Sequence, residues 1–226
     1  MKFKKLKNGC CSDYSNIPGT DKWIYSVIGD KHKDFYDVKE SKELNEPING
    51  NKLVIYSYPE GKSYVPYEIK YGIYYGDIIF IKGSLFILKA DFNENKVTII
   101  KYVPDENILE EIYSFNIDDL NLYNLKLGKY PLMLFNSDRN GVEEKFVLYY
   151  PEKLEINITE RDSFIVRDGD VFYFTRWSEE GIDENGSATE NYRYYENIVK
   201  FNKDGEFLSC EEGYLCEMPN GEFWIF

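Results

Sequence analysis

The residues with the clearest capacity for chemistry lie in one segment, between Trp177 and Asn197. This segment interrupts a series of short apolar runs and is rich in arginine and large aromatic side chains, the types enriched at the energetic centres of protein interfaces. Long loops on a rigid scaffold often carry function. The segment therefore predicts a binding surface, with candidate residues Arg176, Trp177, Tyr192, Arg193, Tyr194 and Tyr195. The alternative is an exposed hairpin extension whose aromatic side chains pack back onto the sheet.

Catalytic signatures are scarce in this chain. Its one histidine, His32, lies between Lys31 and Lys33, a context typical of a solvated loop. Zinc-hydrolase and Ser-His-Asp mechanisms would both depend on that single residue. There is no glycine-rich phosphate loop and no Gly-x-Ser-x-Gly turn. We therefore expect no catalytic residue and no cofactor, and the balance leans away from an enzyme.

Two groups have the residue types of a metal site without its spacing. The four cysteines, at positions 10, 11, 210 and 216, form no Cys-x-x-Cys pair, so we expect free thiols in a reducing cytosol. The run from Asp183 to Ser187 has the composition of a calcium loop and departs from the spacing of one. We therefore expect no metal.

Acidic residues often stand next to each other, as in Glu179-Glu180 and Glu211-Glu212. Neighbouring residues of a strand face opposite ways, so these pairs are expected to be surface charge. A glycosidase would need two carboxylates from different strands facing one cleft, and aromatic side chains would suit stacking on a sugar. A carbohydrate-active or other hydrolytic enzyme with carboxylates in a central cleft is therefore the alternative function.

The charge balance restricts the partners. The formal net charge is −13, from 40 acidic and 27 basic residues, and an acidic surface repels phosphate backbones. We expect no nucleic-acid partner and favour a basic protein, as for an acidic inhibitor or immunity-type protein. No apolar run approaches the length of a membrane span, and the basic start has no apolar segment behind it. We therefore expect no membrane association and a cytoplasmic location, with the oligomeric state left open.

The elements that must position these residues are strands. A phrase of glycine, acid and four large apolar residues occurs at Gly76–Ile81, Gly169–Phe174 and Gly221–Phe226. We interpret each copy as a turn followed by a buried strand. Asp168-Gly169 and Asp204-Gly205 predict tight hairpin turns. Residues 105–115 fit either a helix or a strand, and their neighbours favour a strand.

Further apolar runs bounded by turn residues predict strands throughout the chain. They are 23–28, 53–58, 67–75, 78–81, 85–88, 97–103, 132–135, 146–150, 154–158, 164–166, 171–176, 198–201, 206–209 and 223–226. The chain contains only two alanines, the best helix former, which also argues against a mostly helical fold.

In the segments 76–100, 169–208 and 221–226, the chain resembles β-propeller proteins. Both longer segments repeat the order of turn, strand, strand, turn and strand, and units of this size are typical of propeller blades. The resemblance implies an all-β fold, a small irregular propeller of about five blades. The alternative is a β-sandwich or two small β domains. We expect an irregular segment at 1–20 and a single all-β repeat domain at 21–226.

Overall fold

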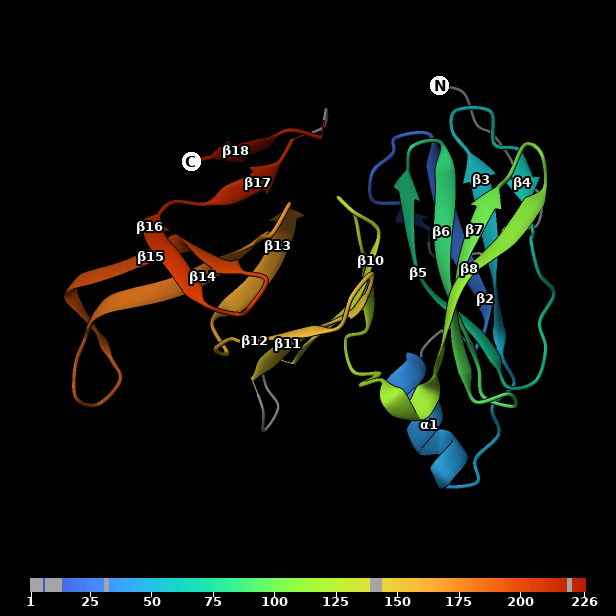
Figure 1. Cartoon of the computed structure of the whole chain (residues 1–226), viewed down its shortest axis with the longest axis horizontal. Helices are drawn as coiled ribbons and strands as arrows, with labels where there is room; N and C mark the ends of the chain where they lie inside the picture. Colours follow the sequence, from blue (N-terminus) through green and yellow to red (C-terminus); the bar gives the residue numbers. More distant parts are fainter. Residues whose placement is uncertain (1–5, 7–13, 31–32, 139–143, 219–220) are drawn as a thin grey trace. The chain divides into compact units, whose positions relative to one another are not determined.

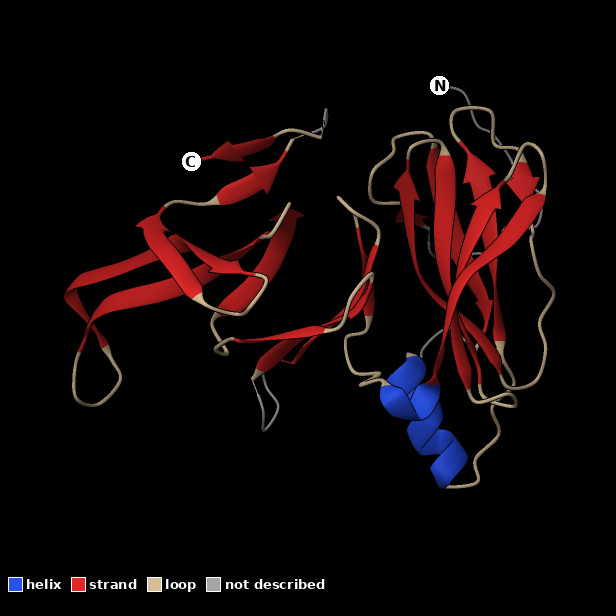
Figure 2. Ribbon diagram, viewed as in Figure 1, coloured by secondary structure: helices blue, strands red, loops and turns tan. Residues whose placement is uncertain are grey.

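A computed structural model describes residues 6, 14–30, 33–138, 144–218 and 221–226. The chain divides into two compact units, Met1–Lys129 and Tyr130–Phe226, and both consist mostly of antiparallel strands (Figure 1, Figure 2). His32, Cys10 and Cys11 lie outside the described residues. Within the part of the chain that is described, no helix is long and apolar enough to cross a membrane.

Unit 1 contains two four-stranded antiparallel sheets in which each strand pairs with the next in sequence. The first sheet consists of β1 (Ser15–Asn16), β2 (Trp23–Gly29), β3 (Asn51–Ser57) and β4 (Ser63–Tyr64). The second consists of β5 (Ile73–Ile81), β6 (Ser84–Asp91), β7 (Lys96–Val103) and β8 (Ile108–Asn116). A 3₁₀ turn (Ile117–Asp119) and the short strand β9 (Lys126–Gly128) complete the unit. Strand β1 lies within the segment that we expected to be irregular.

The core of unit 1 lies between its two sheets. Leu53 and Ile55 of β3 are buried in the same cluster as Ile78 of β5 and Ile87 of β6. Because alternate residues of a strand share one face, these positions put one face of each sheet against the other. Trp23 of β2 is partly buried against the same cluster. The two layers thus give the loops at their ends a rigid base.

Helix α1 (Phe35–Glu43) was not predicted from the sequence. It starts at a capping box in which Asp34 accepts a hydrogen bond from the Asp37 backbone and Asp37 accepts one from the Asp34 backbone. Phe35 and Val38 are buried. With so few apolar positions and no alanine, its helical periodicity is weak, so the capping residues were the usable signal.

The strand prediction for residues 105–115 is confirmed by β8. The separate strands expected at 67–75 and 78–81 are instead one strand, β5, which begins only at Ile73. Its register shifts between Tyr75 and Ile78, so Gly76 lies in a bulge inside the strand rather than in a turn, and our interpretation of this glycine was wrong. A Cβ atom on Gly76 would lie 2.9 Å from the Phe35 ring, which explains why glycine occupies the bulge.

Unit 2 begins with three antiparallel strands, β10 (Met133–Asp138), β11 (Lys145–Tyr150) and β12 (Leu154–Asn157). A four-stranded sheet follows, made of β13 (Asp162–Asp168), β14 (Val171–Ile182), β15 (Ala188–Asn202) and β16 (Phe207–Glu212). A two-stranded ribbon of β17 (Leu215–Glu217) and β18 (Phe223–Ile225) ends the chain. The tight turns predicted at Gly169 and Gly205 are confirmed, because they join β13 to β14 and β15 to β16.

The core of unit 2 is aromatic. Phe146 of β11 contacts Phe172 and Phe174 of β14 edge-to-face, with ring centroids 5.9 and 5.4 Å apart. Phe174 makes a similar contact with Phe201 of β15. Edge-to-face pairs contribute about 0.5–1.5 kcal/mol beyond the burial of their area. This cluster holds the base of β14 and β15 in place.

The fold is therefore mostly β, with repeated four-stranded antiparallel sheets, as the repeated phrases predicted. The three copies of the phrase do not occupy equivalent places. The first lies inside β5, the first strand of its sheet, whereas the second begins β14, the second strand of its sheet. The third contains β18, the last strand of the terminal ribbon. Closure into a propeller stays a prediction.

Candidate functional site

The predicted binding segment is the outer half of a long hairpin. Strand β14 has 12 residues and β15 has 15, and both run past the strands beside them (Figure 1). Pairing with β13 ends at Arg176, and pairing with β16 ends at Asn197. Beyond these residues the sheet narrows to a two-stranded ribbon, so the segment expected as an insertion is a continuous extension of both strands.

Two local features shape the end of this ribbon. Asp183 closes the tip, because its carboxylate accepts hydrogen bonds from the backbone N–H groups of Asn185 (2.9 Å) and Ser187 (2.8 Å). Those bonds account for the acidic, glycine-containing run that resembles a calcium loop in composition. Gly181 lies where the register shifts, with φ of +71°. A Cβ atom there would lie 2.4 Å from the Asn191 carbonyl oxygen, so the ribbon needs glycine at this bulge.

The register assigns each candidate side chain to one face of the ribbon. Trp177 pairs with Glu196, and Glu179 pairs with Tyr194; residues directly opposite each other share a face, as do alternate residues of one strand. The acidic face therefore carries Trp177, Glu179, Tyr192, Tyr194 and Glu196. The opposite, paired face carries Arg176, Ser178, Glu180, Arg193, Tyr195 and Asn197. The six predicted residues divide equally between the two faces.

On the paired face, both arginines are matched to carboxylates, and Glu180 accepts the Tyr195 hydroxyl at 2.8 Å. Arg176 makes two hydrogen bonds of 2.6 and 2.8 Å to the fully buried carboxylate of Asp162. Arg193 forms an ion pair with Glu212 and lies over the Tyr195 ring, 4.7 Å from its centroid. An arginine that is stacked or partly buried and already bonded to a carboxylate stabilises the fold. This face thus holds the base of the hairpin to the sheet.

On the acidic face, the carboxylates have only neutral partners. The hydroxyl of Tyr192 donates to Glu179 at 2.7 Å, and that of Tyr194 donates to Glu196 at 3.3 Å. Among the residues that the structure describes, neither glutamate forms an ion pair. Tyr192 and Tyr194 are 42% and 54% exposed. The result is a row of alternating carboxylates and aromatic rings whose negative charge is not compensated.

Arg161 makes a cation–π contact with the first aromatic ring of this row, Trp177. Its guanidinium carbon lies 4.5 Å from the centre of the Trp177 ring, at the end of the acidic face nearest the sheet. Such cation–π contacts are attractive because the ring face is electron-rich. The aromatic rings farther out, Tyr192 and Tyr194, have no cation over them in the described part of the chain.

The tyrosines of the hairpin are hard to ionise. The pKa of Tyr192 is raised mainly because its hydroxyl donates to Glu179, which favours the protonated phenol. The pKa of Tyr195 is raised for the same reason by Glu180. For Tyr194, desolvation is the largest cause of the raised pKa, followed by the charge of Glu196. All three phenols are therefore neutral donors near neutral pH.

Four residues that complete these faces were not among the predicted site residues: Arg161, Glu179, Glu196 and Glu212. Glu179 and Glu180 were treated only as surface charge. The usable signal was the period of two in Trp177-x-Glu179 and Tyr192-x-Tyr194-x-Glu196, which places acids and rings on one side of a strand. Whether these residues bind a partner stays a prediction.

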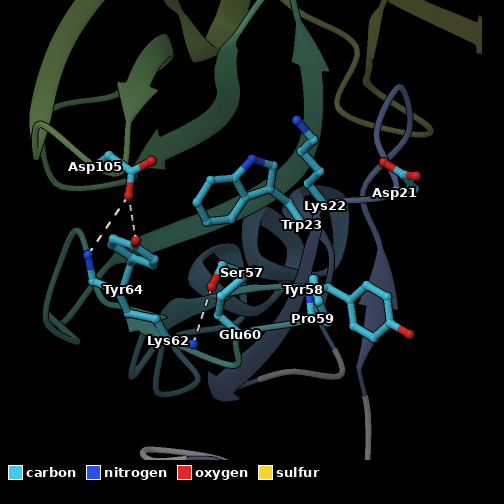
Figure 3. Close-up of a pocket in the computed structure, with 10 residues that line it drawn as sticks. All are labelled: Asp21, Lys22, Trp23, Ser57, Tyr58, Pro59, Glu60, Lys62, Tyr64 and Asp105. Atoms are coloured by element: carbon cyan, nitrogen blue, oxygen red, sulfur yellow. Dashed lines mark hydrogen bonds and ion pairs between the residues drawn. The ribbon is translucent and has the colours of Figure 1, made fainter.

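A second candidate site is a groove of about 650 Å³ in unit 1 (Figure 3). On one side, the Tyr64 hydroxyl donates to Asp105 at 2.7 Å, and the Lys62 ammonium lies 4.5 Å over the Tyr64 ring. Trp23 packs edge-to-face on Tyr64 with centroids 5.4 Å apart. The groove is lined by Asp21, Lys22, Trp23, Ser57, Tyr58, Pro59, Glu60, Lys62, Tyr64 and Asp105. Three carboxylates thus stand in one groove with three aromatic rings.

A smaller cavity of about 280 Å³ in unit 1 contains Asp77. Its carboxylate accepts a hydrogen bond of 2.8 Å from the Leu127 backbone N–H. Burial raises the pKa of Asp77. This hydrogen bond ties β9 to the bulge of β5, which gives Asp77 a structural role.

Among the described residues, no group of three or more histidine, cysteine or acidic side chains is arranged to hold a metal ion. No family model matches the chain, and neither a curated protein nor a solved structure matches it.

Proposed function

We propose that this protein is a binding module that presents the acidic face of its β14–β15 hairpin to a basic protein. The observation that carries the proposal is the asymmetry of the hairpin, because both of its arginines lie on one face and pair with carboxylates, whereas the glutamates of the other face form no ion pair among the described residues. Residues 178–197 include six acidic residues and one arginine, so this ribbon concentrates negative charge. Complementary charge steers association and favours a basic partner over others.

One form of this function is an acidic inhibitor or immunity-type protein that covers the basic surface of a toxin or nuclease. The exposed tyrosines would supply contact area at low conformational cost, because a tyrosine has only two side-chain torsions. The glutamates would supply the attraction. Closure of the repeated sheets into a small propeller, which we also propose, would give the hairpin a rigid base.

The test uses two neighbouring glutamates as matched variants. Glu179→Gln removes a charge from the acidic face, and Glu180→Gln removes one from the paired face. Each carboxylate accepts a tyrosine hydroxyl, at 2.7 and 2.8 Å, so the two changes cost similar local contacts. Binding is measured by biolayer interferometry against a panel of purified, strongly basic small proteins, including cationic nucleases.

We expect a binder in the panel whose affinity falls at least tenfold with Glu179→Gln and less than threefold with Glu180→Gln. The affinity should also fall as salt is raised, because exposed charges are screened. Equal effects of the two variants, or no binder in the panel at low salt, would contradict the proposal.

The groove of unit 1 supports a second candidate function, a carbohydrate-active or other hydrolytic protein. Asp21 and Asp105 lie on opposite sides of Trp23 in Figure 3, as expected for a groove that holds a sugar against an aromatic ring. Tyr58 is 62% exposed and can be removed without opening the core. We expect Tyr58→Ala to weaken binding of an oligosaccharide from a glycan array, and Glu60→Gln or Asp105→Asn to reduce any hydrolysis of it.

A further inference from the structure

The terminal ribbon of β17 and β18 turns one face toward the sheet of β13 to β16. Its register pairs Leu215 with Ile225 and Glu217 with Phe223, so these four side chains share a face. Leu215 is buried and Phe223 is partly buried, both in the cluster that contains Ile198 of β15. This face therefore holds the ribbon to the sheet, and the opposite face points away from it.

The opposite face of the ribbon is aromatic and exposed. Cys216 pairs with Trp224, and Tyr214 exchanges two backbone hydrogen bonds of 3.0 Å with Phe226, so these side chains share the outer face. Tyr214, Trp224 and Phe226 are all exposed, and the rings of Trp224 and Phe226 lie 6.4 Å apart. Aromatic side chains are enriched where proteins bind each other. The ribbon thus presents a group of rings that its own sheet does not cover.

The ribbon lies on the same side of the sheet as the acidic face. Ile198 is two residues from Glu196 in β15, so both side chains are on one face of the strand, and Ile198 is covered by the ribbon. The connection is direct at Gly213, whose N–H donates to the Glu196 carbonyl at 2.9 Å. A Cβ atom on Gly213 would lie 3.1 Å from Cγ2 of Ile225 and 3.5 Å from Cδ1 of Ile198. Ile225, which is 59% exposed, therefore stands at the inner end of the acidic face.

The exposed apolar side chains of the ribbon form what we call the terminal apolar patch: Tyr214, Trp224, Ile225 and Phe226. The charges around this patch discriminate between occupants. Residues 204–226 include six acidic residues and no basic one, and Glu222 accepts a hydrogen bond from the Trp224 indole N–H at 3.4 Å. A second copy of the chain would bring like charges together, which is unfavourable. A partner with cations beside its own apolar side chains would be attracted by the glutamates and would cover the rings.

We propose that the terminal apolar patch and the acidic face form one continuous interface, which binds a partner segment that carries an apolar or aromatic anchor next to its lysines or arginines. The inference rests on the binding function proposed above and specifies the chemistry of the partner. The anchor packs against Trp224 and Ile225, and the cations lie beside Glu196 and Tyr194. Burial of the anchor adds an attraction that salt does not screen.

The test separates the apolar contribution from the charge with three acetylated dodecapeptides in a glycine–serine background. The first carries four lysines followed by tryptophan, leucine and phenylalanine. The second keeps the lysines and has serine in place of the three apolar residues. The third keeps the apolar residues and has glutamate in place of each lysine. Dissociation constants are measured with the full chain by isothermal titration calorimetry.

We expect the first peptide to bind at least tenfold more tightly than either of the others. Ile225→Ser should weaken the first peptide at least fivefold and change the second less than twofold. Ile108→Ser is the matched control, because Ile108 is 50% exposed at the start of β8 in unit 1. It removes the same kind of side chain from a strand end outside the interface, and it should change neither peptide by more than twofold.

A second readout uses the unmodified chain, so it does not depend on how well a variant folds. The isoleucine methyl groups are labelled with ¹³C and followed by NMR as each peptide is added. The methyl resonances of Ile225 should shift with the first peptide and not with the second, and those of Ile108 should shift with neither.

Equal binding of the first two peptides, with no shift at Ile225, would overturn the continuous interface. The comparison of Glu179→Gln with Glu180→Gln against the basic-protein panel would then still judge the acidic face. Tight binding of the glutamate peptide, or equal effects of Ile225→Ser and Ile108→Ser, would also overturn the inference. So would failure of all three peptides to bind, and the panel would judge the binding function independently. A dimer in sedimentation that Ile225→Ser dissociates would show that a second copy is the occupant and overturn the proposal.

Discussion

The two faces of the β14–β15 hairpin both carry glutamates and aromatic residues, but they differ in the partners of their charged groups. The paired face contains two arginines, each matched to a carboxylate, Arg176 to Asp162 and Arg193 to Glu212. The acidic face has glutamates whose partners are tyrosine hydroxyls. The comparison shows that composition alone does not identify a binding surface. The pairing of the charges, which depends on register, separates a structural face from one that is available to a partner.

The largest effect should come from breaking the ion pair at the base of the paired face. Arg176→Met would leave the fully buried Asp162 with the hydrogen bonds from Thr159 and no cation. An uncompensated buried charge costs about 3–5 kcal/mol. We expect the free energy of unfolding to fall by about 3 kcal/mol in a urea titration. Glu179→Gln on the acidic face is the control, and its effect should stay within about 0.5 kcal/mol.

If these two variants destabilised the protein equally, the division into a structural and an available face would be wrong. The division would also be wrong if Arg176→Met left the free energy of unfolding unchanged but abolished binding. In that case Arg176 would belong to the binding surface, as the sequence analysis expected.

Gly181→Val should have a smaller, local effect on stability. It should disrupt the outer ribbon and so disorder both of its faces. The substitution places a branched side chain at φ of +71° and against the Asn191 carbonyl, and such backbone strain costs about 1–3 kcal/mol. Because the ribbon beyond this point has exposed side chains, we expect local opening rather than global unfolding. Amides from Ala188 to Arg193 should exchange faster while those of β13 stay protected. Uniformly faster exchange over unit 2 would contradict this expectation.

The sequence predicted the inner parts of this hairpin as strands, at 171–176 and 198–201, but neither its outer strands nor its faces. Turn signals such as Asp168-Gly169 located the hairpins correctly, because glycine at positive φ is a strong local requirement. The strands around Trp177 and Tyr194 were read as an insertion because they are mostly polar and lack the apolar run that marks a buried strand. Cross-strand pairing stabilises this two-stranded ribbon instead. Arg176 and Trp177 are adjacent in sequence and therefore lie on opposite faces, which a list of interface-prone residues cannot reveal.

Other failures have the same origin. The capping box of Asp34 and Asp37 was visible in the sequence, but the short helix has too little apolar periodicity to draw attention. Gly76 was read as a turn because a bulge and a turn both use glycine, and the register of β5 with β6 is what identifies the bulge. The arrangement of the sheets depends on packing between residues far apart in sequence, so repeated phrases indicate repeated sheets without fixing how they close.

A modest effect is expected from the surface ion pair of the paired face. Arg193 and Glu212 are 52% and 55% exposed in their side chains, and exposed ion pairs contribute about 0.2–1 kcal/mol. A double-mutant cycle with Arg193→Gln and Glu212→Gln should give a coupling free energy in that range, decreasing as salt is raised. A coupling well above this range would mean that the ion pair is shielded from solvent and anchors the outer ribbon.

The smallest and most face-specific effect should be seen in the tyrosines. Glu179 raises the pKa of Tyr192, and Glu180 raises that of Tyr195. Each phenol ionises at lower pH in the unfolded chain than in the folded one, so the stability that these hydrogen bonds contribute is present below about pH 10. It is lost as the pH rises through the higher pKa of the folded state. Glu179→Gln should therefore lower the pKa of Tyr192 and, to a smaller extent, that of Tyr194 on the same face. Glu180→Gln should lower the pKa of Tyr195 on the paired face.

These shifts can be followed by NMR titration of the tyrosine ring carbons. Because each glutamate acts on the tyrosine of its own face, crossed effects would mean that the two faces are not separated as the register requires. Independent shifts would show that each carboxylate is held by its own tyrosine in solution. The acidic face would then meet a basic partner with its glutamates already oriented, so that less side-chain freedom is lost on binding.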